Sequence, residues 1–308
     1  MIKLLFLSYV FVFTLFADEP IVPIPLDEPI DIPKAKLGKE LFFDTLLSRD
    51  NSIACVSCHD IYNGGADNRV VSIGFNGAKG NIHALTVLNA RYNFKQFWNG
   101  RVNTLVEQAT GPLSDPTEHN MDPRKIQERV NLSKKYKKMF KEAYGTYTIT
   151  YELILDAIVA FENALTTPNA KFDKYLRGEI KLTQDEQEGY TLFKQYGCIT
   201  CHNGINVGGN SFQKMGTFVE YNATATFPDR SDVTHNKEDI NVFKVPTLRN
   251  IAKTAPYFHD ASAQTLKEAL TIMSKHNLGI ELSSQESDKI ILFLETLSGD
   301  MPKILDTF

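Results

Sequence analysis

The 308-residue sequence predicts a mainly α-helical protein made of two similar halves, with little β-structure. Three observations support this prediction. A Cys-x-x-Cys-His motif occurs once in each half. Apolar residues recur at helical spacing behind several capping-box sequences, whereas runs with the strict alternation of strands are few. Because 43% of the residues are apolar, the chain can bury a core in each of two domains.

Each Cys-x-x-Cys-His motif provides two thiols and an adjacent imidazole. The residues are Cys55, Cys58, His59, Cys198, Cys201 and His202. This pattern is the attachment signature of c-type haem, in which both thiols form thioethers to the porphyrin and the histidine ligates the iron. A disulfide or half of a zinc site needs no histidine after the second cysteine, and zinc sites favour other spacings. Since the motifs use all four cysteines, the sequence predicts two covalently bound haem c groups.

Residues 1–17 have the features of a secretory signal peptide. Lys3 provides a positive charge, Leu4 to Phe16 form an apolar run, and Ala17 precedes polar residues. The run is shorter than the ~20 residues that span a bilayer, and no later segment has a transmembrane pattern. Because bacteria attach c-type haem outside the cytoplasm, we expect a periplasmic mature chain without a membrane span. The net charge of −4 argues against a nucleic-acid partner.

Residues 18–166 are predicted to form the first haem domain. The stretch from Pro20 to Pro33 is typical of an extended arm, and Pro33 opens a short helix with an apolar face. Residues 64–80 are rich in Gly and Asn and predict an irregular loop beside the first motif. The clearest helix runs from Tyr151 to Leu165, with apolar residues at i, i+3 and i+4 spacing. The sequence Thr-Thr-Pro-Asn at residues 166–169 ends it.

Residues 167–308 are predicted to form the second haem domain. Capping boxes begin helices after Thr183, Thr265 and Ser283, each with a glutamate three residues later. The second haem motif follows the first of these helices. In both halves a segment that begins with Gly and ends with Leu-Phe precedes the motif, at residues 38–42 and 189–193. This repetition indicates a duplicated module.

A haem iron has a second axial position, and the ligand there separates electron transfer from small-molecule chemistry. Met273 is the leading candidate at the second haem, because it shares one apolar helical face with Leu266, Ala269 and Leu270. The spacing taken alone favours a methionine that simply fills the core.

Six stretches of the sequence resemble the bacterial dihaem cytochrome c peroxidases in order and spacing. They are Leu37–Asp44, Thr86–Asn89, Gln96–Arg101, Gln108–Leu113, Phe243–Asn250 and Ala255–Asp260. The resemblance covers essentially all of the mature sequence. It implies two cytochrome-c-like haem domains that reduce hydrogen peroxide to water with electrons from a small c-type cytochrome or a cupredoxin. Relatives are commonly homodimers, so a homodimer is also expected.

The resemblance also implies roles for single residues. Met273 becomes the sixth ligand of the second haem, whose His/Met ligation suits the receipt of electrons. Glu118 matches the acid/base residue of the peroxide site at the first haem, and Gln108 matches an orienting amide. Trp98 matches an electron relay between the haems. Without the resemblance, these last three would be two surface polar residues and a core tryptophan.

One position departs from the family pattern at the first haem. Typical members close this haem in the oxidised state with a loop histidine, and Phe75 stands at that position. Because phenylalanine cannot ligate iron, we expect a five-coordinate first haem that needs no reductive activation. His83 is the alternative ligand, although a lone loop histidine is more often solvated or hydrogen-bonded.

Calcium binding is doubtful because an oxygen ligand is missing. His83 replaces an asparagine that helps to bind an inter-domain calcium ion in relatives, and a soft imidazole suits calcium poorly. The other contacts in relatives are backbone carbonyls at the positions of Thr254 and Pro256. His259 belongs to the inter-haem region in relatives, and its role is left open. The resemblance assigns no role to His119, the neighbour of Glu118.

Two other functions remain open on the sequence. A high-valent dihaem oxidase that modifies a partner protein is favoured by the absent loop histidine. It is disfavoured by Met273, because the tryptophan-modifying relatives carry tyrosine there. A non-catalytic dihaem electron carrier would need a strong sixth ligand on the first haem, which Phe75 does not provide. The presence of Glu118 and Gln108 also favours chemistry over transfer alone.

Overall fold

A computed structural model describes residues 19–223 and 227–306 of the chain. The predicted signal peptide, residues 1–17, therefore lies outside the described residues. The helices are α1 Ile32–Phe43, α2 Leu105–Ser114, α3 Pro123–Leu132, α4 Lys134–Tyr144, α5 Tyr151–Ala164, α6 Lys171–Leu176, α7 Gln184–Gln195, α8 Ser231–Thr234, α9 Leu266–Met273 and α10 Ser284–Glu295.

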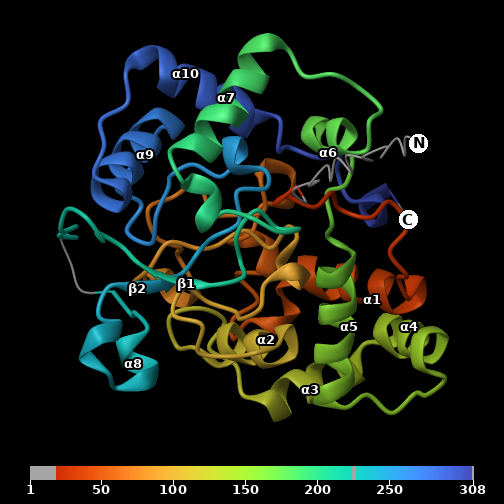
Figure 1. Ribbon diagram of the computed structural model, residues 1–308. Helices are drawn as coiled ribbons and strands as arrows, with labels where there is room; N and C mark the ends of the chain where they lie inside the picture. The colour runs from red at the N-terminus through yellow and green to blue at the C-terminus, as the bar shows by residue number, and fades with distance from the viewer. Residues whose placement is uncertain (1–18, 224–226, 307–308) are drawn as a thin grey trace, which may run out of the picture.

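Helices and irregular loops make up most of the molecule. In the described part of the chain, named strands are limited to β1 (Phe212–Lys214) and β2 (Val242–Lys244), which pair antiparallel. Figure 1 shows α1 to α5 grouped on one side, with α7, α9 and α10 on the other. The predicted mainly α-helical fold is confirmed.

The first half is built around the contact between α1 and α5. Asp31 caps α1, and Pro33 lies in its first turn, where a missing amide hydrogen costs nothing. Gly38 permits close approach, because a Cβ there would lie 1.8 Å from the carbonyl oxygen of Ala157 in α5. The helices predicted to begin at Pro33 and Tyr151 are confirmed.

The second half repeats this arrangement with α7 and α10. Thr183 and Ser283 begin the two helices with the predicted capping boxes. A Cβ on Gly189 of α7 would lie 1.9 Å from the carbonyl oxygen of Lys289 in α10. The glycine before each haem motif therefore lets two helices touch, which supports a duplicated module.

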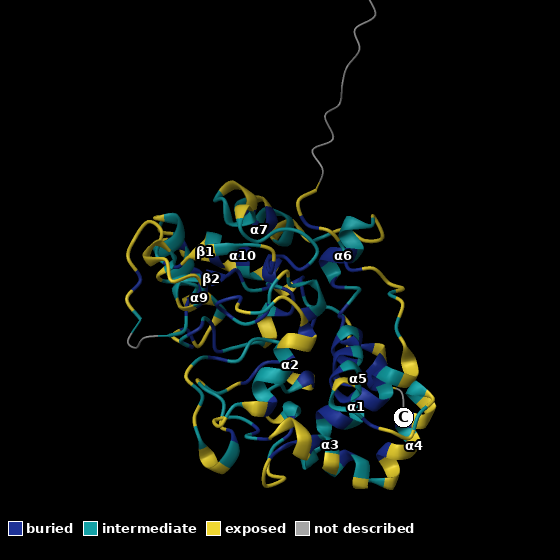
Figure 2. Ribbon diagram, turned by 90° about the horizontal axis from the view of Figure 1, so that it is seen from below, coloured by how far each residue is buried: buried dark blue, intermediate teal, exposed yellow. Residues whose placement is uncertain are grey.

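The first described residues pack on the second half, and the last described residues pack on the first half. Ile21 is buried in the core between α7 and α10. Ile304 and Leu305 are buried in the core of α1 and α5, where Figure 2 shows buried residues concentrated. Apart from these crossed ends, the two cores lie within residues 35–165 and 172–297, and the predicted domains 18–166 and 167–308 remain a prediction.

A buried polar cluster joins the halves near the predicted boundary. Asn89 and Asn250 each donate a side-chain hydrogen bond to Thr167 Oγ1, at 2.8 and 2.9 Å. The Thr167 amide donates to Asn89 Oδ1 at 2.9 Å. Both asparagines have left-handed backbone and begin a 3₁₀ turn, so they are equivalent residues in the two halves.

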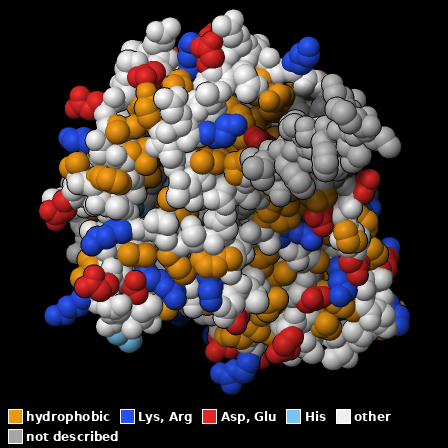
Figure 3. Space-filling model, viewed as in Figure 1, with side chains coloured by type: hydrophobic (Ala, Val, Ile, Leu, Met, Phe, Trp, Pro, Cys, Tyr) orange, Lys and Arg blue, Asp and Glu red, His pale blue; other side chains and the backbone are white. Residues whose placement is uncertain are grey.

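The outer surface carries both signs of charge. In Figure 3, Lys and Arg are interspersed with Asp and Glu around the visible face. Of the helices that the structure describes, none combines the length and apolar character that crossing a membrane would require.

Candidate functional site

The first Cys-x-x-Cys-His motif forms a tight turn before the loop at residues 64–80. The His59 amide donates to the Cys55 carbonyl at 3.0 Å, which closes the turn. His59 Nδ1 lies 3.3 Å from the carbonyl oxygen of Gly65. Since a carbonyl can only accept, Nδ1 carries the proton and Nε2 keeps the lone pair that an iron ligand needs.

This motif lines a cavity in the first half. The lining residues are Phe42, Ile53, Ala54, Cys55, Cys58, His59, Gln108, Ala109, Pro112, Leu113, Glu118, His119, Ile158 and Glu162. Cys55 and Cys58 are not joined in a disulfide, and burial raises the pKa of both thiols. Two thiols, an imidazole with a free Nε2 and a largely apolar wall fit a covalently attached haem.

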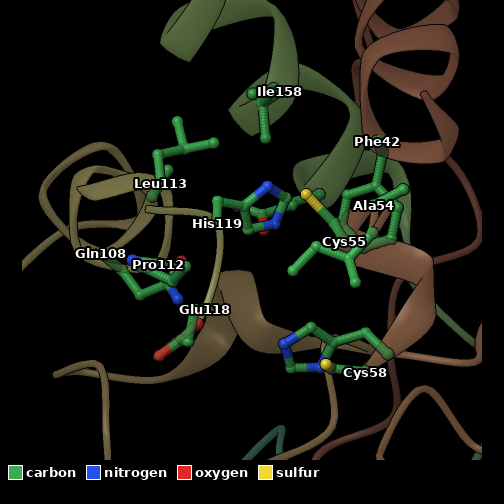
Figure 4. Close-up of a pocket in the computed structure, with 14 residues that line it drawn as sticks. Phe42, Ala54, Cys55, Cys58, Gln108, Pro112, Leu113, Glu118, His119 and Ile158 are labelled. Carbon is green, nitrogen blue, oxygen red and sulfur yellow. The ribbon is translucent and has the colours of Figure 1, made fainter. Parts of the chain in front are cut away.

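Glu118 and Gln108 lie in the same cavity. Figure 4 shows them on one side, with Cys55 and Cys58 on the other. Gln108 belongs to α2, and Glu118 to the turn that follows this helix. Burial and the neighbouring Asp115 raise the pKa of Glu118 to about 7, against a lowering effect of Arg101. At neutral pH both protonation states are populated, so this carboxyl can accept and donate a proton.

The second motif folds in the same way. The His202 amide donates to the Cys198 carbonyl at 3.0 Å, and Cys198 and Cys201 carry free thiols. Burial lowers the pKa of His202 to about 4, so the imidazole stays neutral and available as a ligand. A Cβ on Gly208 would lie 2.2 Å from the Pro246 carbonyl oxygen, so glycine lets the segment after this motif approach Pro246 beside the His202 ring. These residues fit a second covalent haem.

Met273 and Trp98 meet in an apolar cluster between the two halves. Met273, the last residue of α9, packs half-buried against a cluster formed by Trp98, Met215, Tyr221 and Phe243. Trp98 is buried, and its Nε1 donates to the His83 carbonyl at 2.8 Å. Its ring centre lies 6.1 Å from that of His259. The structure thus brings the predicted relay residue together with His259, whose role the sequence left open.

Comparison with known proteins decides the family. The family model described as di-haem cytochrome c peroxidase matches residues 33–181, and the cytochrome c model matches residues 186–298. The chain is 48% identical to the cytochrome c551 peroxidase of Nitrosomonas europaea, over 93% of this chain and 86% of the relative. The chain belongs to the dihaem cytochrome c peroxidase family.

Other relatives agree with this assignment. The chain is 42% identical to the cytochrome c peroxidase Ccp of Escherichia coli K12, and it spans 62% of that longer protein. A solved structure of a MauG-like protein associated with microbial copper homeostasis superposes with a TM-score of 0.81, at 29% identity over 94% of this chain and 96% of that one. The predicted family, two cytochrome-c-like domains, two haem c cofactors and cytochrome-c peroxidase activity are confirmed. Hydrogen peroxide is the substrate of such an enzyme.

Two residues bear on whether this dihaem peroxidase has an open first haem. Phe75 lies against the distal segment, with its amide donating to the Glu118 carbonyl at 2.8 Å. His83 is buried, and its Nδ1 lies 3.2 Å from the Arg69 carbonyl. His83 is not among the residues that line the cavity. Its backbone serves the contact between the halves, because its amide donates to the His259 carbonyl and its carbonyl accepts from Trp98.

Helices α2 and α9 begin in the same way in the two halves of this peroxidase. The capping boxes of Thr104 and Thr265 begin α2 and α9, so the eighth residue of each helix is Pro112 and Met273 respectively. Pro112 lines the first cavity. Proline has no side-chain atom that can ligate iron, so the position of the methionine in the second half offers no ligand in the first.

Sequence reasoning missed two ionisable residues of the cavity. His119 is buried in its lining, with Nδ1 held 3.2 Å from the Leu47 carbonyl. Glu162 of α5 is also buried there, its Oε2 has no hydrogen-bond partner, and burial raises its pKa to about 8. Because His119 directly follows Glu118 in the sequence, it could have been expected to lie in the same cavity. Glu162 lies on the apolar face of α5, which only weakly indicates that it is buried in the cavity.

The predicted calcium contacts lie at the junction of the halves. A Cβ on Gly64 would lie 2.4 Å from the Lys253 carbonyl and 3.1 Å from Thr254 Cγ2, so the loop beside the first motif packs against the segment before Pro256. Among the residues that the structure describes, no group of three or more His, Cys, Asp or Glu side chains is placed to hold a metal. Whether carbonyls here bind calcium, which the sequence makes doubtful, remains a sequence-based question.

Proposed function

We propose that this chain reduces hydrogen peroxide at the cavity of the first half, with electrons entering through the second half. The overall reaction joins one hydrogen peroxide, two electrons and two protons to form two waters. Two molecules of a one-electron donor, a small c-type cytochrome or a cupredoxin, supply the electrons. The predicted signal peptide supports action in the periplasm, and a homodimer is the expected assembly.

The observation that carries this proposal is the shared cavity of the first motif. It contains the haem attachment residues Cys55, Cys58 and His59 together with Glu118 and Gln108. Bound haem supplies the iron that exchanges electrons with peroxide. The protein supplies an apolar pocket and polar groups on one side of it.

Glu118 is the proposed proton carrier. Cleavage of the O–O bond requires a proton to leave one oxygen and another to reach the departing oxygen. The ionised carboxylate of Glu118 accepts the first proton and then donates it to the departing oxygen, which leaves as water. The Gln108 amide can donate and accept hydrogen bonds, so it orients the peroxide.

The asymmetry between the halves supports the proposed direction of electron flow. Met273 can give the second iron a thioether ligand, which favours electron transfer over substrate binding. Pro112 at the equivalent place supports an open position in the first half. Trp98 is the proposed relay, because its ring lies in the cluster that Met273 joins and its Nε1 is tied to the first half.

The first haem is proposed to be open without prior reduction. Phe75 cannot replace the loop histidine of typical relatives, and His83 is held away from the cavity lining by its contacts with Arg69. His119, the neighbour of Glu118 in sequence, has its Nδ1 3.2 Å from the Leu47 carbonyl oxygen.

The decisive experiment is peroxide-dependent oxidation of a reduced c-type cytochrome. Fully oxidised enzyme is compared with enzyme that has been pre-reduced at the second haem only. Equal turnover from the first second onward is expected in both samples. A lag that pre-reduction removes would show that a protein ligand blocks the first haem.

The same assay separates the other two functions. Absence of turnover with several donors, in both oxidation states, would reject the peroxidase proposal and favour an oxidase that modifies a partner protein. An electron carrier would instead show a low-spin first haem in the resting absorption spectrum, whereas the proposal requires a high-spin one.

A further inference from the structure

Lys244 is a buried cation without a partner among the residues that the structure describes. It lies on β2 with 2% of its surface exposed, and its backbone amide donates to the Trp98 carbonyl at 2.7 Å. In the described part of the chain, no oxygen accepts a hydrogen bond from its Nζ, and no carboxylate acts on its charge. Burial lowers the pKa of Lys244 to about 8, so the side chain is still mostly protonated at pH 7.

Such a cation requires an explanation. Taking an ammonium group out of water costs several kcal/mol unless an anion or several hydrogen bonds replace the water. The buried guanidinium of Arg249 follows that rule, since it pairs with Asp173 at 2.7 Å. For Lys244 the polypeptide offers no such anion among its described residues, so the anion has to come from a bound group.

The surroundings of Lys244 identify that group. Phe243, the preceding residue, stacks on His259 with ring centres 4.2 Å apart and contacts Trp98 edge-on. Two residues after Lys244, the Pro246 carbonyl packs against Gly208, which lies next to the His202 ring. Lys244 thus lies in the chain segment that connects the contact between the halves with the second haem motif. Haem c brings two propionate carboxylates into each half.

We propose that Lys244 binds a haem propionate carboxylate at the contact between the two halves. An ammonium group and a carboxylate form a charge-assisted hydrogen bond, which is short and strong in a site without water. The ion pair gives the buried cation its missing partner and holds one haem at a fixed place beside Trp98. This inference rests on haem loading and does not depend on which half reduces peroxide.

The reduction potential of each haem tests the proposal. Lys244→Met removes the charge and keeps the length of the side chain, whereas Lys214→Met removes an exposed lysine from the paired strand β1 and serves as the control. Loss of a nearby positive charge favours the more positive ferric state. In Lys244→Met we expect the ratio of reduced to oxidised haem, at the wild-type midpoint, to fall about tenfold for one haem, which corresponds to 59 mV.

The two potentials also identify the source of the carboxylate. A shift confined to the first or to the second haem assigns the propionate to that haem, and Lys214→Met leaves both potentials unchanged. Unchanged potentials in Lys244→Met with both haems attached would overturn the proposal.

A second measurement covers the case in which Lys244→Met does not assemble. A crystal structure of the wild-type holoenzyme should place Lys244 Nζ within hydrogen-bond distance of a propionate oxygen. Separation of Nζ from all four propionates by an intervening side chain would overturn the proposal on its own.

Discussion

At the scale of the residue, burial decides the chemistry of the first cavity. Two carboxyls line it, and both have a raised pKa because they are removed from water. Glu118 is half-buried beside Gln108, and its pKa of about 7 suits proton exchange at neutral pH. Glu162 is fully enclosed without a partner, so it holds its proton more firmly.

Replacement of Glu118 tests its role as proton carrier. We expect Glu118→Gln to lower peroxide turnover by about 10²- to 10⁴-fold, the usual contribution of a positioned acid/base group. Because the ionised form accepts the proton, wild-type turnover should rise with pH through about 7, and the variant should lose this inflection. Steady-state rates between pH 5 and 9 measure both effects. The exposed Glu128→Gln in α3 is the matched control, and an unchanged rate in Glu118→Gln would contradict the role.

Glu162 predicts a pH dependence of stability. Its pKa is about 8 in the folded protein and near 4.5 when unfolded, so the folded state binds the extra proton between these values. The stabilisation is therefore complete below about pH 4.5 and is lost as pH rises through 8. Since one pKa unit corresponds to 1.36 kcal/mol, Glu162→Gln should gain on the order of a few kcal/mol over wild type between pH 5 and 9. Urea unfolding at both pH values measures the difference, and parallel curves would refute it.

At the scale of the element, each half contains one closely packed helix pair and one further helix, α2 or α9. The two halves differ in the residue that this further helix carries at its eighth position. Gly38 and Gly189 bring helices together in the same way, so the haem motifs that follow start from equivalent positions. Helices α2 and α9 begin with the same capping box. Their eighth residues, Pro112 and Met273, then differ in the one property that matters for iron, a ligating atom.

Replacement of Pro112 by methionine should change the ligation of the first haem. We expect Pro112→Met to give the first haem a thioether ligand and a low-spin spectrum, and to lower peroxide turnover at least about tenfold, because the ligand competes with peroxide. The change does not weaken α2, since proline inside a helix is unfavourable. Pro112→Leu has a similar side chain without sulfur and should stay high-spin. Absorption spectra of both ferric variants measure the spin state of the first haem. A high-spin spectrum of Pro112→Met would disprove the equivalence of Pro112 and Met273.

At the scale of the whole molecule, the halves are joined by buried polar contacts and by exchanged ends. Thr167 accepts hydrogen bonds from one asparagine of each half. Ile21 and Leu305 pack on the half that is distant in sequence. These links hold the two haem motifs at a fixed separation, which the proposed electron transfer through Trp98 would require.

Loss of the Thr167 hydroxyl should weaken the union of the halves. Thr167→Val keeps the shape but leaves the Asn89 and Asn250 amides unpaired, at a cost of about 2–5 kcal/mol in the free energy of unfolding. Thr191→Val, an exposed threonine on α7, should cost much less. Urea unfolding followed at both haems measures the effect. Equal stability of the two variants would show that the cluster does not join the halves.

The sequence by itself determined the elements whose signals are local. Capping boxes at Thr183, Thr265 and Ser283 and the helical pattern from Tyr151 act over three or four residues, and they predicted helices that the structure contains. The haem motifs are equally local, because five consecutive residues hold both thiols and the iron ligand.

Only the tertiary structure decided which distant residues share a site. It placed His119 and Glu162 in the first cavity, left His83 out of the cavity lining, and left Lys244 buried with no anion among the described residues. Each outcome depends on contacts between segments far apart in the chain. A carboxyl, an imidazole or an ammonium acquires its special chemistry from what surrounds it, and the surroundings exist only after the helices have packed.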